Sequence, residues 1–174
     1  RGQTYVDRAL MSALPQLSFV MRPGSGLDNV DRDAADRYDL YLLNSPEGNR
    51  DAVAEHALGM LLGLLHNIPI ASKSVQDGRW EREVFRGTEL KSLKIGIVGY
   101  GHTGRAFAQK LSGLECPIQV YDKYQEVPSA DTFVTPTTWE ELSQDVDILS
   151  FHVPYTDETH HYFNKTVAEE RQKP

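Results

Sequence analysis

The sequence predicts an α/β fold built on a parallel sheet. Apolar strand-like segments alternate with helix-like segments along the second half of the chain, which is the pattern of such sheets. A glycine-rich turn joins one of these strands to the next helix, and an aspartate ends the strand after that. The 174 residues are 40% hydrophobic and 25% charged, as in globular domains, and suffice for one domain or for one domain and part of another.

The first 45 residues alternate in the same way. Pro15 ends the first helix, and the segment Pro23-Gly24-Ser25-Gly26 is expected to turn, because glycine tolerates positive φ and proline fixes its own. Two strands are too few for a stable sheet on their own, so this part is expected to be an incomplete α/β layer. The expected elements are helices over Asp7–Ala13 and Asp31–Arg37 and strands over Leu17–Met21 and Leu40–Leu43.

A domain boundary is predicted within Asn44–Arg50, where Asn, Ser, Pro, Glu and Gly cluster. The domains are therefore expected over residues 1–47 and 48–174. Asn49 is a suitable N-cap for the helix that follows, and Asp51 in its first turn complements the helix dipole.

This helix, Asp51–His66, is apolar almost all round, which predicts that it is covered on several sides. Gly59 and Gly63 share one face and would let another backbone approach, either in ordinary helix packing or at a subunit interface. A second helix, near Ile70–Gln76, is expected to stop at Gly78 in the left-handed conformation.

The remaining segments predict the parallel sheet itself. The last strand would lie at a sheet edge if nothing followed it, and an apolar edge invites pairing with another chain. The expected strands are Leu93–Val98, Ile118–Tyr121, Thr132–Val134 and Val146–Phe151, and the expected helices are Thr103–Ser112 and Thr138–Gln144.

The segment from Gly99 to Gly104 has the form G-x-G-x-x-G and stands between a strand and a helix. Gly99 allows the tight turn, Gly101 lets the backbone approach a pyrophosphate, and Gly104 allows close packing of helix on strand. Free N–H groups at the helix N-terminus would then face the diphosphate. This context predicts a Rossmann-type, doubly wound parallel sheet that binds a dinucleotide.

Asp122 ends the next strand, about 20 residues beyond the loop, where a ribose-binding acid is expected. Its carboxylate would accept hydrogen bonds from the adenosine ribose and repel a 2′-phosphate, so NAD is the predicted cofactor. Lys123 beside it weakens this preference, and the alternative is a strand-end aspartate in an ordinary turn.

Four histidines and one arginine near this region have less specific interpretations. His102 and Arg105 could each lie near a phosphate or in solvent, and the sequence favours neither position over the other. His152 follows a strand at the end where ligands of parallel sheets collect, although a lone strand-end histidine is more often structural than a catalytic base. His160 and His161 are adjacent, so their rings are expected to point apart, and no metal site is predicted.

Composition excludes several classes of function. The net charge of −7 argues against nucleic acid as a partner. Cys116 is the only cysteine, which fits a reducing, cytoplasmic location. The apolar stretch Ala52–Ile68 contains charged Glu55 and is shorter than the ~20 residues of a bilayer span, so no membrane segment is expected. The chain starts at Arg1 without a methionine or a signal peptide and is expected to be cut there.

Several motifs, in one order along nearly the whole chain, resemble the D-2-hydroxyacid dehydrogenase family, and the phosphoglycerate dehydrogenase branch most of all. They are Arg22-Pro23-Gly24-Ser25-Gly26-Leu27-Asp28-Asn29-Val30-Asp31, Asn44-Ser45-Pro46-Glu47-Gly48-Asn49, Val53-Ala54-Glu55, Asn67-Ile68-Pro69, Gly78-Arg79-Trp80, the glycine loop, and Asp147-Ile148-Leu149-Ser150-Phe151-His152-Val153-Pro154 followed by Glu158-Thr159. The resemblance implies part of a flavodoxin-like substrate domain before the dinucleotide-binding domain.

The resemblance also implies site residues. The substrate carboxylate is expected at the backbone N–H groups of Gly24, Ser25 and Gly26, with Arg1 lining the cleft; Gly2 departs from a serine often found beside it. Asn29 is either a motif residue of that loop or a structural turn residue. The cofactor is expected at Gly99, Tyr100, Gly101, His102, Thr103, Gly104, Asp122, His152, Val153, Pro154 and Thr159.

The family's catalytic arginine, glutamate and histidine have no counterpart here, because the chain stops at Lys173-Pro174 before the segments that carry them. The resemblance thus implies a piece, cut at both ends, of an oxidoreductase that passes hydride between NAD and a D-2-hydroxy acid or 2-oxo acid, usually as a homodimer. Two alternatives stay open: a catalytically inactive NAD-binding or interaction module, as in the family's NAD(H)-sensing corepressors, and a merely stable fragment.

Overall fold

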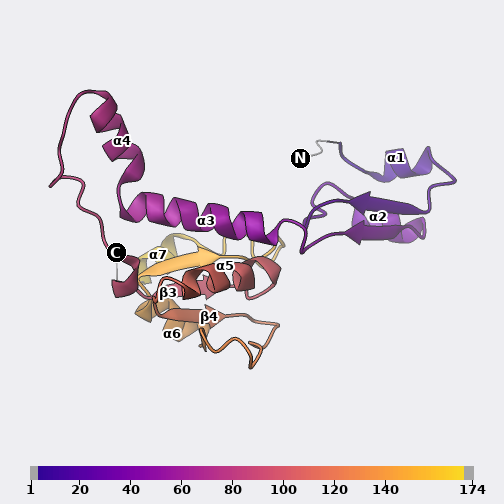
Figure 1. The fold of residues 1–174 in the computed structure, drawn as a ribbon. Helices are drawn as coiled ribbons and strands as arrows, with labels where there is room; N and C mark the ends of the chain where they lie inside the picture. The colour runs from indigo at the N-terminus through magenta and orange to yellow at the C-terminus, as the bar shows by residue number, and fades with distance from the viewer. Residues whose placement is uncertain (1–3, 171–174) are drawn as a thin grey trace. The chain divides into compact units, whose positions relative to one another are not determined.

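The computed structural model describes residues 4–170. The chain divides into two compact units, Arg1–Arg50 and Asp51–Pro174 (Figure 1). The division follows residue 50, whereas the sequence pattern put it after residue 47.

The first unit consists of two helices and two parallel strands. Asp7 and Asp31 cap the two helices through their carboxylates, which accept hydrogen bonds from backbone N–H groups at 2.9 Å in both cases. One face of the strand pair packs on a small core around Met11 and Ala35, while Met21 and Tyr41 on the other face are 65% and 72% exposed. The elements are α1 (Arg8–Ser12), β1 (Phe19–Arg22), α2 (Arg32–Arg37) and β2 (Tyr41–Asn44), with Phe19 paired to Tyr41 and Arg22 to Asn44.

A long apolar helix, α3 (Arg50–Leu65), opens the second unit. Only one of its faces is covered: Ala54 is fully buried, and Leu58 and Leu61 pack against the same core. Met60 and Leu64 are 60% and 76% exposed, so the expectation that this helix is covered on several sides is wrong within the described chain. Its other apolar face has no partner among the described residues.

The next helix, α4 (Ile68–Gln76), bends away from α3 by 61°. It starts two residues earlier than expected, because Pro69 fits the first helical turn. No single helix among the described residues is long and apolar enough to cross a membrane, whereas α3 and α4 taken together pass that test by length and composition alone.

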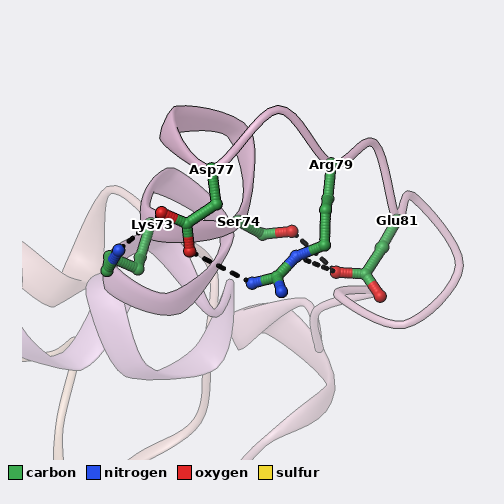
Figure 2. A network of polar contacts seen from close by, with 5 residues as sticks. All are labelled: Lys73, Ser74, Asp77, Arg79 and Glu81. Atoms are coloured by element: carbon green, nitrogen blue, oxygen red, sulfur yellow. Dashed lines mark hydrogen bonds and ion pairs between the residues drawn. The ribbon is translucent and has the colours of Figure 1, made fainter.

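A polar network holds the chain where α4 ends (Figure 2). Gly78 has the expected left-handed φ of 77°. Asp77 pairs with Lys73 at 2.6 Å and with Arg79 at 3.3 Å. Glu81 accepts a hydrogen bond from the buried Ser74 hydroxyl at 2.7 Å and pairs with Arg79 at 3.4 Å. Trp80, which stands between Arg79 and Glu81 in the sequence, is 82% exposed.

Four parallel strands form the sheet of the second unit in the order β5-β4-β3-β6. The expected strand at Thr132–Val134 is wrong: Asp131–Val134 forms a turn, in which the Val134 N–H donates to the Asp131 carbonyl, and β5 follows it. The elements after α4 are η1 (Leu90–Ser92), β3 (Ile95–Val98), α5 (His102–Ser112), β4 (Ile118–Tyr121), β5 (Thr135–Pro136), α6 (Trp139–Asp145), β6 (Ile148–Phe151) and α7 (Lys165–Glu170).

Helices cover both faces of this sheet, as the doubly wound pattern predicts. On one face, Phe107 and Leu111 of α5 share a buried cluster with Ile95 and Ile97 of β3 and with α3. On the other face, Leu142 of α6 belongs to a separate cluster with Val98 and Val146. The central strand β3 is buried at all four positions, and β6 lies at the edge of the described sheet.

Candidate dinucleotide site

The strand order puts a topological switch point at the carboxyl ends of β3 and β6, where an open parallel sheet forms a crevice. After β3 the chain adds β4 and β5 on one side of it, and then crosses to add β6 on the other side. Such a reversal is the point where open parallel sheets bind ligands. The glycine loop follows β3 and residues 152–159 follow β6, so the segments predicted to bind the cofactor flank the same crevice.

The three glycines of the loop have different surroundings. Gly99 has a φ of 89°, and a methyl group on it would lie 2.8 Å from the carbonyl oxygen of His152. A methyl group on Gly104 would lie 2.0 Å from the carbonyl oxygen of Gly99, so only glycine fits there. On Gly101 it would meet nothing within 4 Å. Gly99 and Gly104 therefore serve packing, and Gly101 leaves space for a ligand.

The helix that follows, α5, begins without a side-chain cap: Gly101 is its N-cap residue. The N–H groups of a first helical turn have no acceptor within the helix, and together with the helix dipole they favour an anion. His102 is exposed at this end, and Thr103 is partly exposed. Gly101, His102 and Thr103 thus form an open, electropositive helix end, while the other predicted loop residues, Gly99, Tyr100 and Gly104, are buried.

The Asp122 carboxylate faces this loop. Its Oδ2 accepts a hydrogen bond from the Tyr100 N–H at 2.6 Å, and its Oδ1 accepts from the N–H groups of Tyr124 and Gln125 at 2.8 and 2.9 Å. Because a carboxylate has about four acceptor positions, Oδ2 keeps one for a ribose hydroxyl. The structure therefore brings Asp122 and the glycine loop together as the spacing predicts.

A buried carboxylate, Asp131, fixes the loop from behind. It is 6% exposed and binds Arg105 through two hydrogen bonds of 2.7 and 2.9 Å. It also accepts a hydrogen bond from the Tyr100 hydroxyl at 3.0 Å. Burial, and then the bond to Asp131, raise the pKa of Tyr100, while Arg105 lowers the pKa of Asp131. Arg105, for which the sequence left a phosphate and solvent open, is paired with Asp131 while its side chain stays 51% exposed.

No feature of the sequence pointed to a role for Asp131. This residue lies 26 residues after Arg105 in a turn, and no motif marks a contact at that distance along the chain. The arrangement ties α5 to the turn before β5, so it positions the glycine loop without providing a group for the ligand.

The ring of His152 is packed beneath the loop. It lies 5.2 Å from the Phe107 ring, and its Nε2 lies 2.9 Å from the Ser150 hydroxyl. Burial lowers the pKa of His152 to about 4. A ring that stays neutral at pH 7 is a poor proton acceptor compared with a base poised near that pH, so the geometry favours a structural role.

The segment after His152 forms a closed turn. The Thr159 hydroxyl donates to the Pro154 carbonyl at 2.5 Å and accepts from the Thr156 N–H at 2.8 Å. A methyl group on Gly99 would touch Val153 at 3.0 Å, so Val153 borders the glycine loop. These contacts place the predicted residues 153, 154 and 159 in one loop beside the crevice.

The rings of His160 and His161 do not point apart as expected. Their centroids lie 3.9 Å from each other, because His161 adopts a positive φ of 54°. Within residues 4–170, no group of three or more His, Cys, Asp or Glu side chains is arranged to hold a metal ion.

The predicted substrate loop lies in the first unit. The Gly24 N–H donates to the Arg22 carbonyl at 2.9 Å, so this group is occupied. The Asn44 side chain donates to the Ser25 carbonyl at 2.8 Å, and Arg22 binds the Gly26 carbonyl. The N–H groups of Ser25 and Gly26 have no acceptor in the described part of the chain. Arg1, also predicted at the substrate, lies outside the described residues.

Comparison with known proteins agrees with this geometry. A family model described as the NAD binding domain of D-isomer specific 2-hydroxyacid dehydrogenases matches residues 58–173. The chain is 37% identical to D-3-phosphoglycerate dehydrogenase of Synechocystis over its whole length, and 35% identical to that of Archaeoglobus fulgidus over 91% of its length. It spans 31% and 30% of these relatives, about a third of each.

Two solved structures have the same fold. The chain matches D-2-hydroxyisocaproate dehydrogenase with a TM-score of 0.85 at 26% identity, over 97% of this chain and 52% of that one. It matches an NAD-dependent formate dehydrogenase from Staphylococcus aureus, in complex with NAD, with a TM-score of 0.83 at 29% identity, over 96% of this chain and 50% of that one. The chain belongs to the D-isomer specific 2-hydroxyacid dehydrogenase family and is similar to its phosphoglycerate dehydrogenases.

Proposed function

We propose that this chain is the dinucleotide-binding part of an oxidoreductase that passes hydride between NAD and a D-2-hydroxy acid or the corresponding 2-oxo acid. The observation that carries the proposal is the joint placement of an uncapped helix N-terminus at Gly101 and a carboxylate at Asp122 on one crevice. Bound NAD would supply the hydride acceptor at its nicotinamide ring. The names of the similar enzymes support the choice of substrate class.

The residues of this chain would bind and orient. The N–H groups at the start of α5 would hold the diphosphate, and Asp122 would accept hydrogen bonds from the adenosine ribose. Residues 152–154 and 159 would line the side of the crevice next to β6. In the first unit, the unbonded N–H groups of Ser25 and Gly26 would hold the substrate carboxylate, with Arg1 nearby.

Calorimetry with NADH on the 174-residue chain, run beside a turnover assay, tests this proposal. The 174-residue chain should bind NADH with a 1:1 stoichiometry and show no turnover. A longer form of the protein that carries the family's catalytic segments should oxidise phosphoglycerate, lactate or glycerate with NAD. Absence of NADH binding to the chain at millimolar concentration would contradict the nucleotide site. Binding in the longer form without turnover of any of these acids, or of glyoxylate, would contradict the substrate class.

A second candidate is an NAD-binding module without catalytic activity. Its basis in the described residues is that His152, the ring packed next to the loop, is not available as a base near neutral pH, which fits a site that only binds. The same two assays separate the candidates. If the second candidate is correct, the longer form of the protein binds NADH but reduces no 2-oxo acid.

We also propose that two copies of the chain form a homodimer through α3 and α4. A groove of about 600 Å³ runs between these helices. Two glycines on its wall, Gly59 and Gly63, have nothing within 4 Å of an added methyl group, so a second backbone can approach. The groove is apolar, being lined by Gly59, Met60, Gly63, Leu64, Pro69 and Ile70 among others. A patch of this kind marks an interaction site.

Light scattering on the purified chain tests the dimer. The wild type should have twice the 19.6 kDa mass of the chain, and Leu64→Glu should halve it, because the charge would be buried in the groove. Gln109→Glu, an equal charge change on the exposed side of α5, is the matched control and should stay dimeric. A wild type of 19.6 kDa at 100 µM, or a dimeric Leu64→Glu, contradicts this interface.

The compartment is proposed to be the cytoplasm. Cys116 is buried and free in the structure, which fits a reducing environment. A fluorescent fusion of the full-length protein should distribute through the cytoplasm, and accumulation in an oxidising compartment would contradict this.

A further inference from the structure

Glu158, in the loop after β6, binds two side chains that follow Asp122. One carboxylate oxygen accepts from the Lys123 ammonium, and the other accepts from the Tyr124 hydroxyl. The ammonium also lies 5.3 Å from the centre of the Tyr124 ring. Because β3 lies between β4 and β6 in the sheet, these contacts bridge the loops on either side of the strand that leads into the glycine loop.

The contact with Glu158 changes the charge that Lys123 presents to a ligand. This residue stands directly after the ribose-binding position, where a cation accommodates the 2′-phosphate of NADP. Here the ammonium is already paired. The hydrogen bond from Lys123 lowers the pKa of Glu158, and the bond to Glu158 raises the pKa of Lys123, so both groups are charged across the physiological range. The pair thus presents no net positive charge beside Asp122.

We propose that Glu158 is a cofactor-specificity residue, which holds Lys123 in this bridge and so selects an adenosine ribose without a 2′-phosphate. The inference rests on the proposed dinucleotide site and goes beyond it. Asp122 alone repels the phosphate, but a free ammonium one residue away would offset that repulsion. Glu158 removes that offset by pairing with the ammonium, so the negative charge of Asp122 is left uncompensated near the ribose.

The competing interpretation is a surface ion pair without a function in binding. The side chains of Lys123 and Glu158 are 57% and 44% exposed, and pairs of this exposure contribute little to stability. Substitution of either residue would therefore change the free energy of unfolding very little under either interpretation. The ratio of the dissociation constants for NADP and NAD separates them.

Calorimetry on the 174-residue chain gives that ratio with NAD and NADP as the probes. Glu158→Gln should lower the ratio at least tenfold, mainly through tighter NADP binding, because Lys123 is released towards the phosphate. The double variant Glu158→Gln with Lys123→Gln should lose this tighter binding of NADP, because the ammonium is absent. Asp157→Asn removes the same charge from the neighbouring exposed residue and should change the ratio less than threefold.

Each outcome decides between the two interpretations. A ratio for Glu158→Gln equal to that for Asp157→Asn overturns the inference and leaves the proposed site intact. A gain in NADP binding that persists in the double variant overturns the role of Lys123. If the wild type binds neither nucleotide, the proposed function fails and the inference fails with it.

Discussion

Gly101 and Gly104 differ in what surrounds them, although they belong to one motif. Gly104 is in contact with the Gly99 carbonyl, so its lack of a side chain lets α5 approach β3. Gly101 faces open space, so its lack of a side chain matters only when a ligand occupies that space. Substitutions at the two positions should therefore have different effects, on stability at Gly104 and on ligand binding at Gly101.

Gly104→Ala should lower the free energy of unfolding by about 1–3 kcal/mol, since the methyl group must displace backbone. Gly101→Ala, at the N-cap of α5, should lower it by less than about 1 kcal/mol, yet bind NADH at least tenfold more weakly. Urea unfolding and calorimetry measure the two effects. A stable Gly104→Ala, or a Gly101→Ala with unchanged affinity, would contradict these roles.

The buried ring of His152 predicts how the stability of the protein depends on pH. Its pKa is lowered by burial from 6.5 to about 4, so the native state keeps the ring neutral where the unfolded chain would protonate it. The associated stability is fully present above pH 6.5 and is lost as pH falls towards 4, by a total on the order of 3 kcal/mol.

An NMR titration of the histidine ring protons tests this, with His102 as the exposed control in the same spectra. The His152 signals should titrate near pH 4, or remain unchanged until the protein unfolds. A His152 midpoint above pH 6 would show that the ring is accessible to solvent and would reopen its role as a base.

At residue scale, the spacing of motif residues predicted the glycine loop and Asp122, because adjacent strand, turn and helix bring them together. The pairs Arg105–Asp131 and Lys123–Glu158 were not predicted. They join residues 26 and 35 positions apart, and only the folded sheet decides which loops meet.

At the scale of single elements, capping residues determine where several helices begin. Thr138 and Glu141 form a capping box at the start of α6, in which each side chain binds the backbone N–H of the other residue. The hydrogen bond from Thr137 to Glu141 is the main cause of the lowered pKa of Glu141. Because α6 covers one face of the sheet through Leu142, its cap contributes to the stability of the second unit.

Thr138→Ala should lower the free energy of unfolding by about 1 kcal/mol, through loss of the cap. Thr138→Asp should restore most of the loss, since aspartate is an equally good N-cap residue. Urea unfolding followed by circular dichroism measures both variants. Equal stability of the wild type and Thr138→Ala would contradict a contribution from the cap.

Most elements were predicted to within two residues, because apolar periodicity and caps are local signals. The strand expected at Thr132–Val134 was wrong, since the apolar Phe133 and Val134 pack on the core from a turn. The apolar pattern of α3 is present as expected, but a pattern of this kind cannot show which molecule covers the second face.

At the scale of the whole molecule, both units are built from parallel strands, and only the second carries a complete set of features for a dinucleotide. The sheet order β5-β4-β3-β6 brings the loop after β3, the loop after β4 and the loop after β6 to one crevice. The sequence predicted the alternation of strands and helices, from which a parallel sheet follows. The position of β6 at the described edge was also expected.

The backbone of residues 99–104 and the Asp122 carboxylate are together expected to hold one dinucleotide, and the proposed function depends on this. The most direct test is an amide NMR titration of the ¹⁵N-labelled chain with NAD. We expect the largest shift changes at Tyr100, Gly101, His102 and Thr103, with smaller changes at Lys123, and a loss of these changes in Asp122→Ala. Changes centred on any other surface, or no change at millimolar NAD, would contradict a dinucleotide site at this loop.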